Sequence, residues 1–64
     1  MKKEATDMLK LITAMTNKPL KELNVIDYWA GSEVNERINA YDLIKMLIIE
    51  GKIFRTAEND IKLV

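Results

Sequence analysis

The side chains that could do chemistry in this sequence are few and poorly suited to catalysis. The chain contains no histidine to move protons near neutral pH and no cysteine to act as a nucleophile. Its one serine, Ser32, therefore has no imidazole to activate it. Acidic pairs such as Glu33 with Glu36, or Glu58 with Asp60, arise by chance in a chain with 31% charged residues. Such pairs normally solvate a surface. We therefore expect no enzymatic activity and no small-molecule substrate.

The same residue types leave little with which to bind a metal ion or a phosphate group. Without histidine or cysteine, only oxygen ligands remain, and no stretch has the alternating acidic spacing of a calcium loop. Gly31 and Gly51 are isolated, so they cannot form a glycine-rich loop around a phosphate. We expect neither a metal ion nor another cofactor.

Length and charge place the chain among small, single-domain proteins. Residues 1–64 provide material for one domain. Ten basic and ten acidic side chains cancel, so the chain lacks the overall positive charge typical of nucleic-acid-binding proteins. The longest apolar run, residues 46–49, is far too short to cross a membrane, and charged residues interrupt the N-terminal stretch. We expect a soluble, cytoplasmic protein that makes no membrane contact.

Helical spacing of apolar side chains predicts two helices in the first half of the chain. The first covers residues 4–16, and Asn17 suits the left-handed conformation that ends a helix. Its apolar stripe consists of Ala5, Met8, Leu9, Ile12 and Met15. The second covers about residues 20–29, with Gly31 as its natural stop.

The third helix has two possible starts. Ser32 could cap a long helix that continues to residue 50. The residues that would then share a face are Val34, Ile38 and Tyr41. Alternatively, Asn39 caps a shorter helix, with Asp42 completing an approximate capping box. We favour Asn39, because the shorter helix presents a clear core stripe. That stripe consists of Ala40, Leu43, Ile44 and Leu47. Gly51 ends the helix in both cases.

Two short runs rich in β-forming residues follow and predict an antiparallel hairpin. They are "KIFRT" at residues 52–56 and "IKLV" at residues 61–64. The expected pairs are Thr56 with Ile61, Phe54 with Leu63 and Arg55 with Lys62. The side chains expected on the buried face are then Phe54, Ile61 and Leu63, since alternate residues of a strand point to opposite faces.

Three helices followed by a hairpin is the element order of a winged helix-turn-helix domain, and the chain resembles that superfamily. "LIKMLIIEGKIFRT" is similar to the end of a recognition helix, the glycine and the first strand of the wing. "MLKLITAM" followed by "NKPLKEL" is similar to the first helix, the linker and the second helix. The resemblance implies a small α+β winged helix with three helices and a C-terminal two-stranded β-hairpin.

The resemblance also implies a DNA-binding transcriptional regulator of the small kind found in prokaryotes and their phages. The third helix would enter a groove, and basic side chains would contact phosphates. The candidates are Lys18, Lys21, Arg37, Asn39, Tyr41, Lys45, Arg55 and Lys62. Two departures count against DNA: the turn before the third helix is enlarged, and the wing tip holds Glu58 and Asp60. An ordinary solvated face of mixed charge explains the same basic residues.

The alternative is a winged-helix module for protein–protein contact or homodimerisation. Six of residues 43–49 are apolar, which is more than one helix face can bury. Met46 and Ile49 are therefore either wrapped by the first helix and the wing or presented to a partner, and we favour wrapping. Trp29 is interpreted as a core residue or as a protein-contact anchor. The protein-contact candidates are Trp29, Met46 and Ile49.

Overall fold

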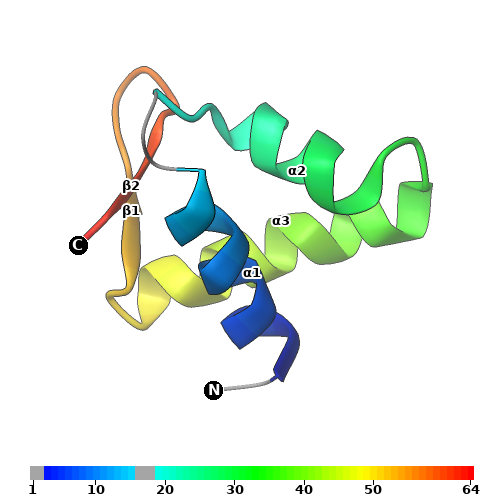
Figure 1. The fold of residues 1–64 in the computed structure, drawn as a ribbon, viewed down its shortest axis with the longest axis horizontal. Helices are drawn as coiled ribbons and strands as arrows, with labels where there is room; N and C mark the ends of the chain where they lie inside the picture. The colour runs from blue at the N-terminus through cyan, green and yellow to red at the C-terminus, as the bar shows by residue number, and fades with distance from the viewer. Residues whose placement is uncertain (1–2, 16–18) are drawn as a thin grey trace.

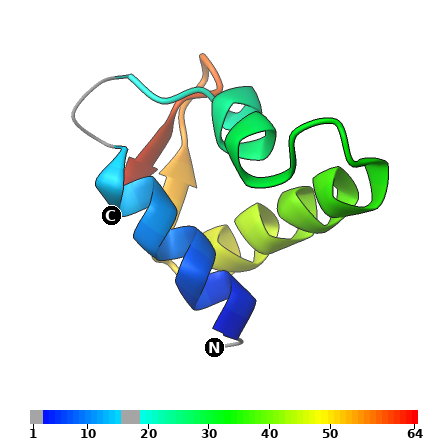
Figure 2. The same ribbon diagram turned by 45° about the vertical axis from the view of Figure 1, so that its right-hand side comes forward.

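The computed structural model describes residues 3–15 and 19–64, which form three helices followed by a two-stranded hairpin (Figure 1). The elements are α1 (Lys3–Ala14), α2 (Glu22–Ala30), α3 (Val34–Ile49), β1 (Ile53–Arg55) and β2 (Ile61–Leu63). Figure 2 shows α2 and α3 joined by a short connection, with the hairpin at the opposite end of α3. The predicted layout of a small α+β domain, with three helices followed by a C-terminal two-stranded antiparallel hairpin, is confirmed. The predicted helix end at Asn17 lies outside the described residues.

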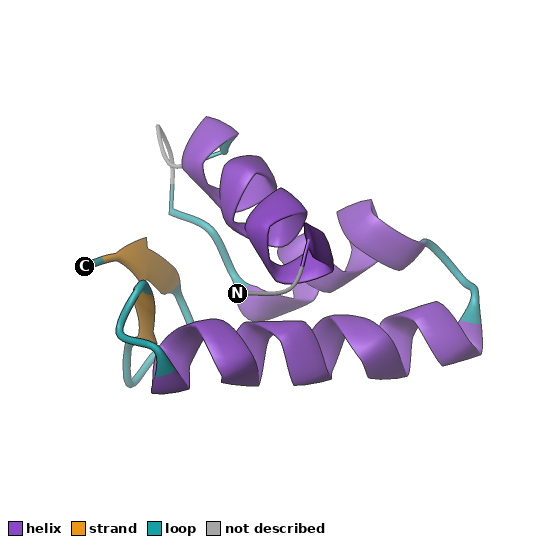
Figure 3. Ribbon diagram, turned by 90° about the horizontal axis from the view of Figure 1, so that it is seen from below, coloured by secondary structure: helices purple, strands orange, loops and turns teal. Residues whose placement is uncertain are grey.

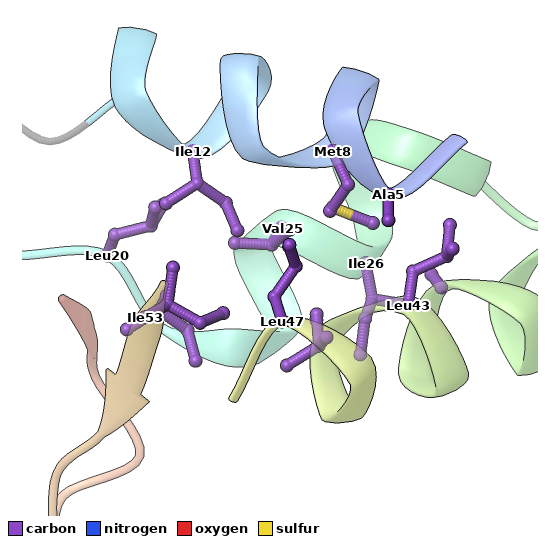
Figure 4. Close-up of a cluster of buried hydrophobic side chains, with 12 residues drawn as sticks. Ala5, Met8, Ile12, Leu20, Val25, Ile26, Leu43, Leu47 and Ile53 are labelled. Carbon is purple, nitrogen blue, oxygen red and sulfur yellow. The ribbon is translucent and has the colours of Figure 1, made fainter. Parts of the chain in front are cut away.

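The core forms where the three helices meet the base of the hairpin (Figure 4). Its buried side chains are Ala5, Met8, Ile12, Leu20, Val25, Ile26, Ala40, Leu43, Ile44, Leu47, Ile53 and Ile61. The whole stripe predicted for the third helix is among them. Half-buried Trp29 and Met46 pack against this cluster.

The third helix begins earlier than expected. Its first residue is Val34, so the favoured start at Asn39 is wrong and the longer alternative is close to the structure. The cap is Glu33, whose carboxylate accepts the backbone N–H of Asn35 at 2.9 Å. Asn39 lies inside the helix, where its side-chain amide donates to Glu4 Oε2 of α1 at 2.8 Å. Asn39 thus links two helices and does not cap one.

Gly51 ends α3 as predicted, by adopting the left-handed conformation with φ +73°. The N–H groups of Gly51 and Lys52 then donate to the carbonyls of Ile48 and Leu47, each at 3.0 Å. These two bonds satisfy carbonyls that the end of a helix leaves without partners. The chain reverses there and enters β1.

A short extended segment before α2 pairs with the hairpin, and the sequence did not predict it. Lys21 bridges Asp60 in an antiparallel sense. The carbonyl of Leu20 accepts the N–H of Ile61 at 2.7 Å. The N–H of Glu22 donates to the carbonyl of Asn59, in the hairpin loop, at 3.0 Å. The second helix therefore begins at Glu22 and not at residue 20.

The hairpin register differs from the predicted one by a single residue. The observed pairs are Ile53 with Leu63, Phe54 with Lys62 and Arg55 with Ile61. The cause is the loop: Thr56 N–H donates to Asp60 O at 2.9 Å, so residues 57–59 make the turn. Asn59 takes φ +63°, as the last residue of a three-residue hairpin loop often does. The prediction had assumed an even number of loop residues.

The change in register exchanges the two faces of β1. Ile53 points into the core and is 1% exposed, whereas Phe54 is 44% exposed. The predicted burial of Phe54 is therefore wrong, and that of Ile61 is confirmed. Leu63 is 36% exposed, so its predicted burial is wrong as well. Arg55 and Lys62 do not oppose each other, since their partners are Ile61 and Phe54.

Candidate interaction surface

A row of apolar side chains follows the face of α3 that points away from the core. The exposed members are Val34 (65%), Ile38 (57%), Tyr41 (43%) and Ile49 (79%). At about 100° per residue, these four and Lys45 fall within an arc of about 80° on the helix surface. Leu43 and Leu47 of the core lie on the opposite side. We call Val34, Ile38, Tyr41, Lys45 and Ile49 the outer stripe.

Figure 3 shows that the outer side of α3 is bare. The helices α1 and α2 lie on one side of α3, and the hairpin lies at its C-terminal end. The elements that pack against α3 are α1, α2 and the β1 strand of the hairpin. A helix with apolar side chains on two opposite faces needs cover on both, and the described part of the chain covers one.

The predicted wrapping of α3 is wrong at Ile49 and holds in part at Met46. Ile49 is the most exposed apolar member of the outer stripe, because the reversal at Gly51 carries β1 to the buried side of the helix. Met46 is half-buried and packs against the core. Trp29 also packs against the core, as its interpretation as a core residue requires.

Arg37, predicted to contact DNA, is instead engaged by the end of α2. Its Nη1 atom donates to Asp27 Oδ1 and to the carbonyl of Gly31, the latter at 2.7 Å. The guanidinium thus completes the tight connection between α2 and α3. It would have to give up a carboxylate before it could contact a phosphate.

Two further basic candidates form ion pairs at the loop end of the hairpin. Lys21 Nζ lies 2.9 Å from Asp60 Oδ1, and it donates to the carbonyl of Glu58 at 3.0 Å. Arg55 donates through Nε and Nη2 to Oε2 of Glu22. Both cations are therefore neutralised by acids that belong to the same corner of the fold.

The remaining DNA-contact candidates are scattered. Tyr41 and Lys45 belong to the outer stripe, and Lys62 opposes Phe54 on the outward face of the hairpin. Neither Lys45 nor Lys62 has an ion-pair partner within residues 3–15 and 19–64. Asn39 is held by Glu4, and Lys18 lies outside the residues that the structure describes. DNA contact by this set stays a prediction.

Charge along α3 is unfavourable for a phosphate backbone. From residue 33 to residue 50, the helix and its caps carry four acidic and two basic side chains, a net charge of −2. The acidic members, all exposed, are Glu33, Glu36, Asp42 and Glu50. DNA-binding surfaces gain affinity by placing cations against phosphates, and here carboxylates outnumber cations.

Val34 and Ile38 were missed as contact candidates. The longer alternative for the third helix already placed them on one face with Tyr41, so the signal was present in their spacing. The start favoured at Asn39 leaves both residues outside the third helix. The observed helix begins at Val34, so it contains the core stripe and the outer face together.

Within residues 3–15 and 19–64, no helix combines the length and the apolar character that a bilayer crossing requires. The same residues contain no cluster of three acidic side chains able to hold a metal ion. Comparison of the chain with protein-family models, with curated proteins and with solved structures finds no match. Its function must therefore be inferred from the outer stripe and the charges around it.

Proposed function

We propose that this domain acts through protein–protein contact and that the outer stripe of α3 is its docking surface. The observation that carries the proposal is the row formed by Val34, Ile38, Tyr41 and Ile49, exposed on the side of α3 opposite the core. Removing apolar surface from water is worth about 25 cal/mol per Å². A contiguous apolar patch on a small domain commonly marks a contact site.

The position of Tyr41 supports the same function. It lies near the middle of the stripe and is 43% exposed, with apolar residues towards both ends of the helix. A tyrosine offers a large apolar ring and a hydroxyl at low entropic cost, so it often anchors an interface. The ion pairs of Lys21, Arg37 and Arg55 add support, because they occupy cations that a DNA surface would use.

DNA binding is the second candidate function. It is favoured by the winged helix-turn-helix resemblance and by Lys45 and Lys62, two exposed cations without an ion-pair partner among the described residues. The net charge of −2 along α3 and its caps counts against it.

The proposed function is tested by a pair of matched substitutions. Ile38 on α3 and Leu23 on α2 are 57% and 56% exposed, so Ile38→Asp and Leu23→Asp make the same chemical change at equal exposure. Tagged wild-type and variant chains are purified from the native host, and any protein retained with the chain is identified and quantified. Circular dichroism confirms that both variants fold.

We expect a protein partner, another protein or a second copy, to be retained by wild type and by Leu23→Asp and lost from Ile38→Asp. Equal retention by the two variants would place the contact elsewhere. The absence of any stoichiometric protein partner of the wild-type chain would overturn the proposed function.

A further inference from the structure

We propose that the occupant of the outer stripe is a second copy of this chain, packed antiparallel along α3. This inference rests on the proposed function and names the partner. Its support is charge complementarity within the face itself. Asp42 and Lys45 are both exposed near the middle of α3, and neither has an ion-pair partner within the described ranges.

A two-fold axis that sets Asp42 against Lys45 of the second copy fixes the rest of the register. Ile38 then lies against Ile49 of the second copy. Each contact occurs twice, because an interface between two identical chains is self-complementary. The dimer contains two ion pairs at its centre and apolar contacts towards both ends.

Other arrangements of the same two helices lose these contacts. A shift of one helical turn sets Lys45 against Ile38 of the second copy, so a charge is partly desolvated without a partner. A parallel arrangement sets Asp42 beside Asp42 and Lys45 beside Lys45, and like charges in an interface are unfavourable. The antiparallel register with paired charges is therefore preferred.

The outer side of α3 is long and uncovered. The 16 residues of α3 span about 24 Å, and Figure 3 shows its outer side uncovered along that length. A standard interface buries about 800 Å² on each partner, roughly a fifth of the 4292 Å² accessible here. A single helix face lies at the small end of that range, so the association should be reversible and dependent on concentration.

Charge reversal provides a direct test of the register. Asp42→Lys gives a chain with two lysines at the centre of the proposed interface, and Lys45→Glu gives a chain with two acids there. Each variant alone would repel its own copy, whereas a mixture of the two restores both ion pairs. Sedimentation equilibrium is measured for wild type, for each variant and for the equimolar mixture.

We expect wild type to dimerise. The dissociation constant of each single variant should be at least about tenfold higher than that of wild type, and the mixture should recover a heterodimer. Ile38→Asp should also be monomeric, while Leu23→Asp should match wild type. If neither charge variant weakens the dimer, or if the mixture fails to recover it, this register is wrong.

Engineered thiols supply a second readout that does not depend on charge. The chain has no native cysteine, so an introduced pair reports without background. The register predicts an efficient disulfide between an Ile38→Cys chain and an Ile49→Cys chain. Ile38→Cys alone should not cross-link, because its two copies would lie about 16 Å apart along the helix axis. Cross-linking of Ile38→Cys with itself in preference to the mixture would overturn the arrangement.

The inference can fail while the proposed function stands. A wild-type chain that remains monomeric up to millimolar concentration excludes a second copy as the occupant. If the wild-type chain then retains another protein in the purification from the native host, and Ile38→Asp does not, the outer stripe remains a docking surface. If Ile38→Asp weakens neither self-association nor the retention of another protein, both the inference and the proposed function are overturned.

Discussion

Arg55 of β1 and Glu22 at the start of α2 form an ion pair that ties the hairpin to the helices. Arg55 donates through Nε, at 3.0 Å, and through Nη2 to the same oxygen, Oε2 of Glu22. The Glu22 side chain is only 17% exposed, whereas that of Arg55 is 40% exposed. The N–H of Glu22 also donates to Asn59 of the hairpin loop, so backbone and side chain hold the same corner.

Replacing Arg55 with Met should weaken that corner, since the carboxylate of Glu22 would be left without its guanidinium. Because Arg55 is partly solvated, we expect a loss of about 1 kcal/mol and a fall in Tm of about 4–8 °C. The loss should shrink in 1 M salt, which screens the charges. Lys62→Met is the control, as Lys62 has no ion-pair partner in the described residues. Equal melts for the two variants would contradict the role of the pair.

The hairpin illustrates what could not be predicted from the sequence. Its existence and approximate limits follow from two β-rich runs and a polar turn, but its register depends on the number of residues in the loop. That number depends on the positive φ of Asn59, a conformation that asparagine tolerates but does not require. The four-residue loop of the expected pairing and the observed three-residue loop are both compatible with the composition, and they place opposite faces of β1 against the core.

The observed register predicts unequal costs for truncating neighbouring residues of β1. Ile53→Ala should lose about 2–4 kcal/mol, because Ile53 is 1% exposed. Phe54→Ala should cost about 1 kcal/mol or less, although it removes the larger side chain, since Phe54 faces outward. Urea unfolding monitored by circular dichroism measures both free energies. The reverse order of costs would restore the register first expected from the sequence.

In α3, the core stripe could be predicted in full, whereas the outer stripe could be predicted only as the face shared by Val34, Ile38 and Tyr41. Ala40, Leu43, Ile44 and Leu47 follow from helical spacing alone, and all four are buried. The exposure of Ile49 depends on the direction in which the chain leaves the helix after Gly51, and no local pattern encodes that direction. The ion pairs that engage Arg37 and Arg55 join segments distant in sequence, so they too required the three-dimensional structure.

Exposure of Ile49 predicts that a polar residue is tolerated there in the monomer. Ile49→Gln should change the free energy of unfolding by no more than about 0.5 kcal/mol, as for other surface substitutions. Ile44→Gln places the same amide in the core and should cost several kcal/mol, much of the stability of a domain this small. Melts are recorded at low protein concentration, where association adds nothing to stability. An unfolded Ile49→Gln variant would show that the residue is buried after all.

A salt-series titration with random duplex DNA separates the two candidate functions. Lys21, Arg37 and Arg55 are engaged by carboxylates, so of the described basic candidates only Lys45 and Lys62 are available for phosphates without breaking an ion pair. The slope of log affinity against log salt is about −0.9 per phosphate contact. We therefore expect a slope no steeper than about −2 and little binding at micromolar protein in physiological salt.

A DNA-binding domain with four to six phosphate contacts would give a slope near −4 to −5. Lys45→Met should then weaken binding to all sequences and flatten the slope by about one. A steep slope that responds to Lys45→Met in this way would establish the outer stripe as a DNA surface and overturn its role as a protein contact.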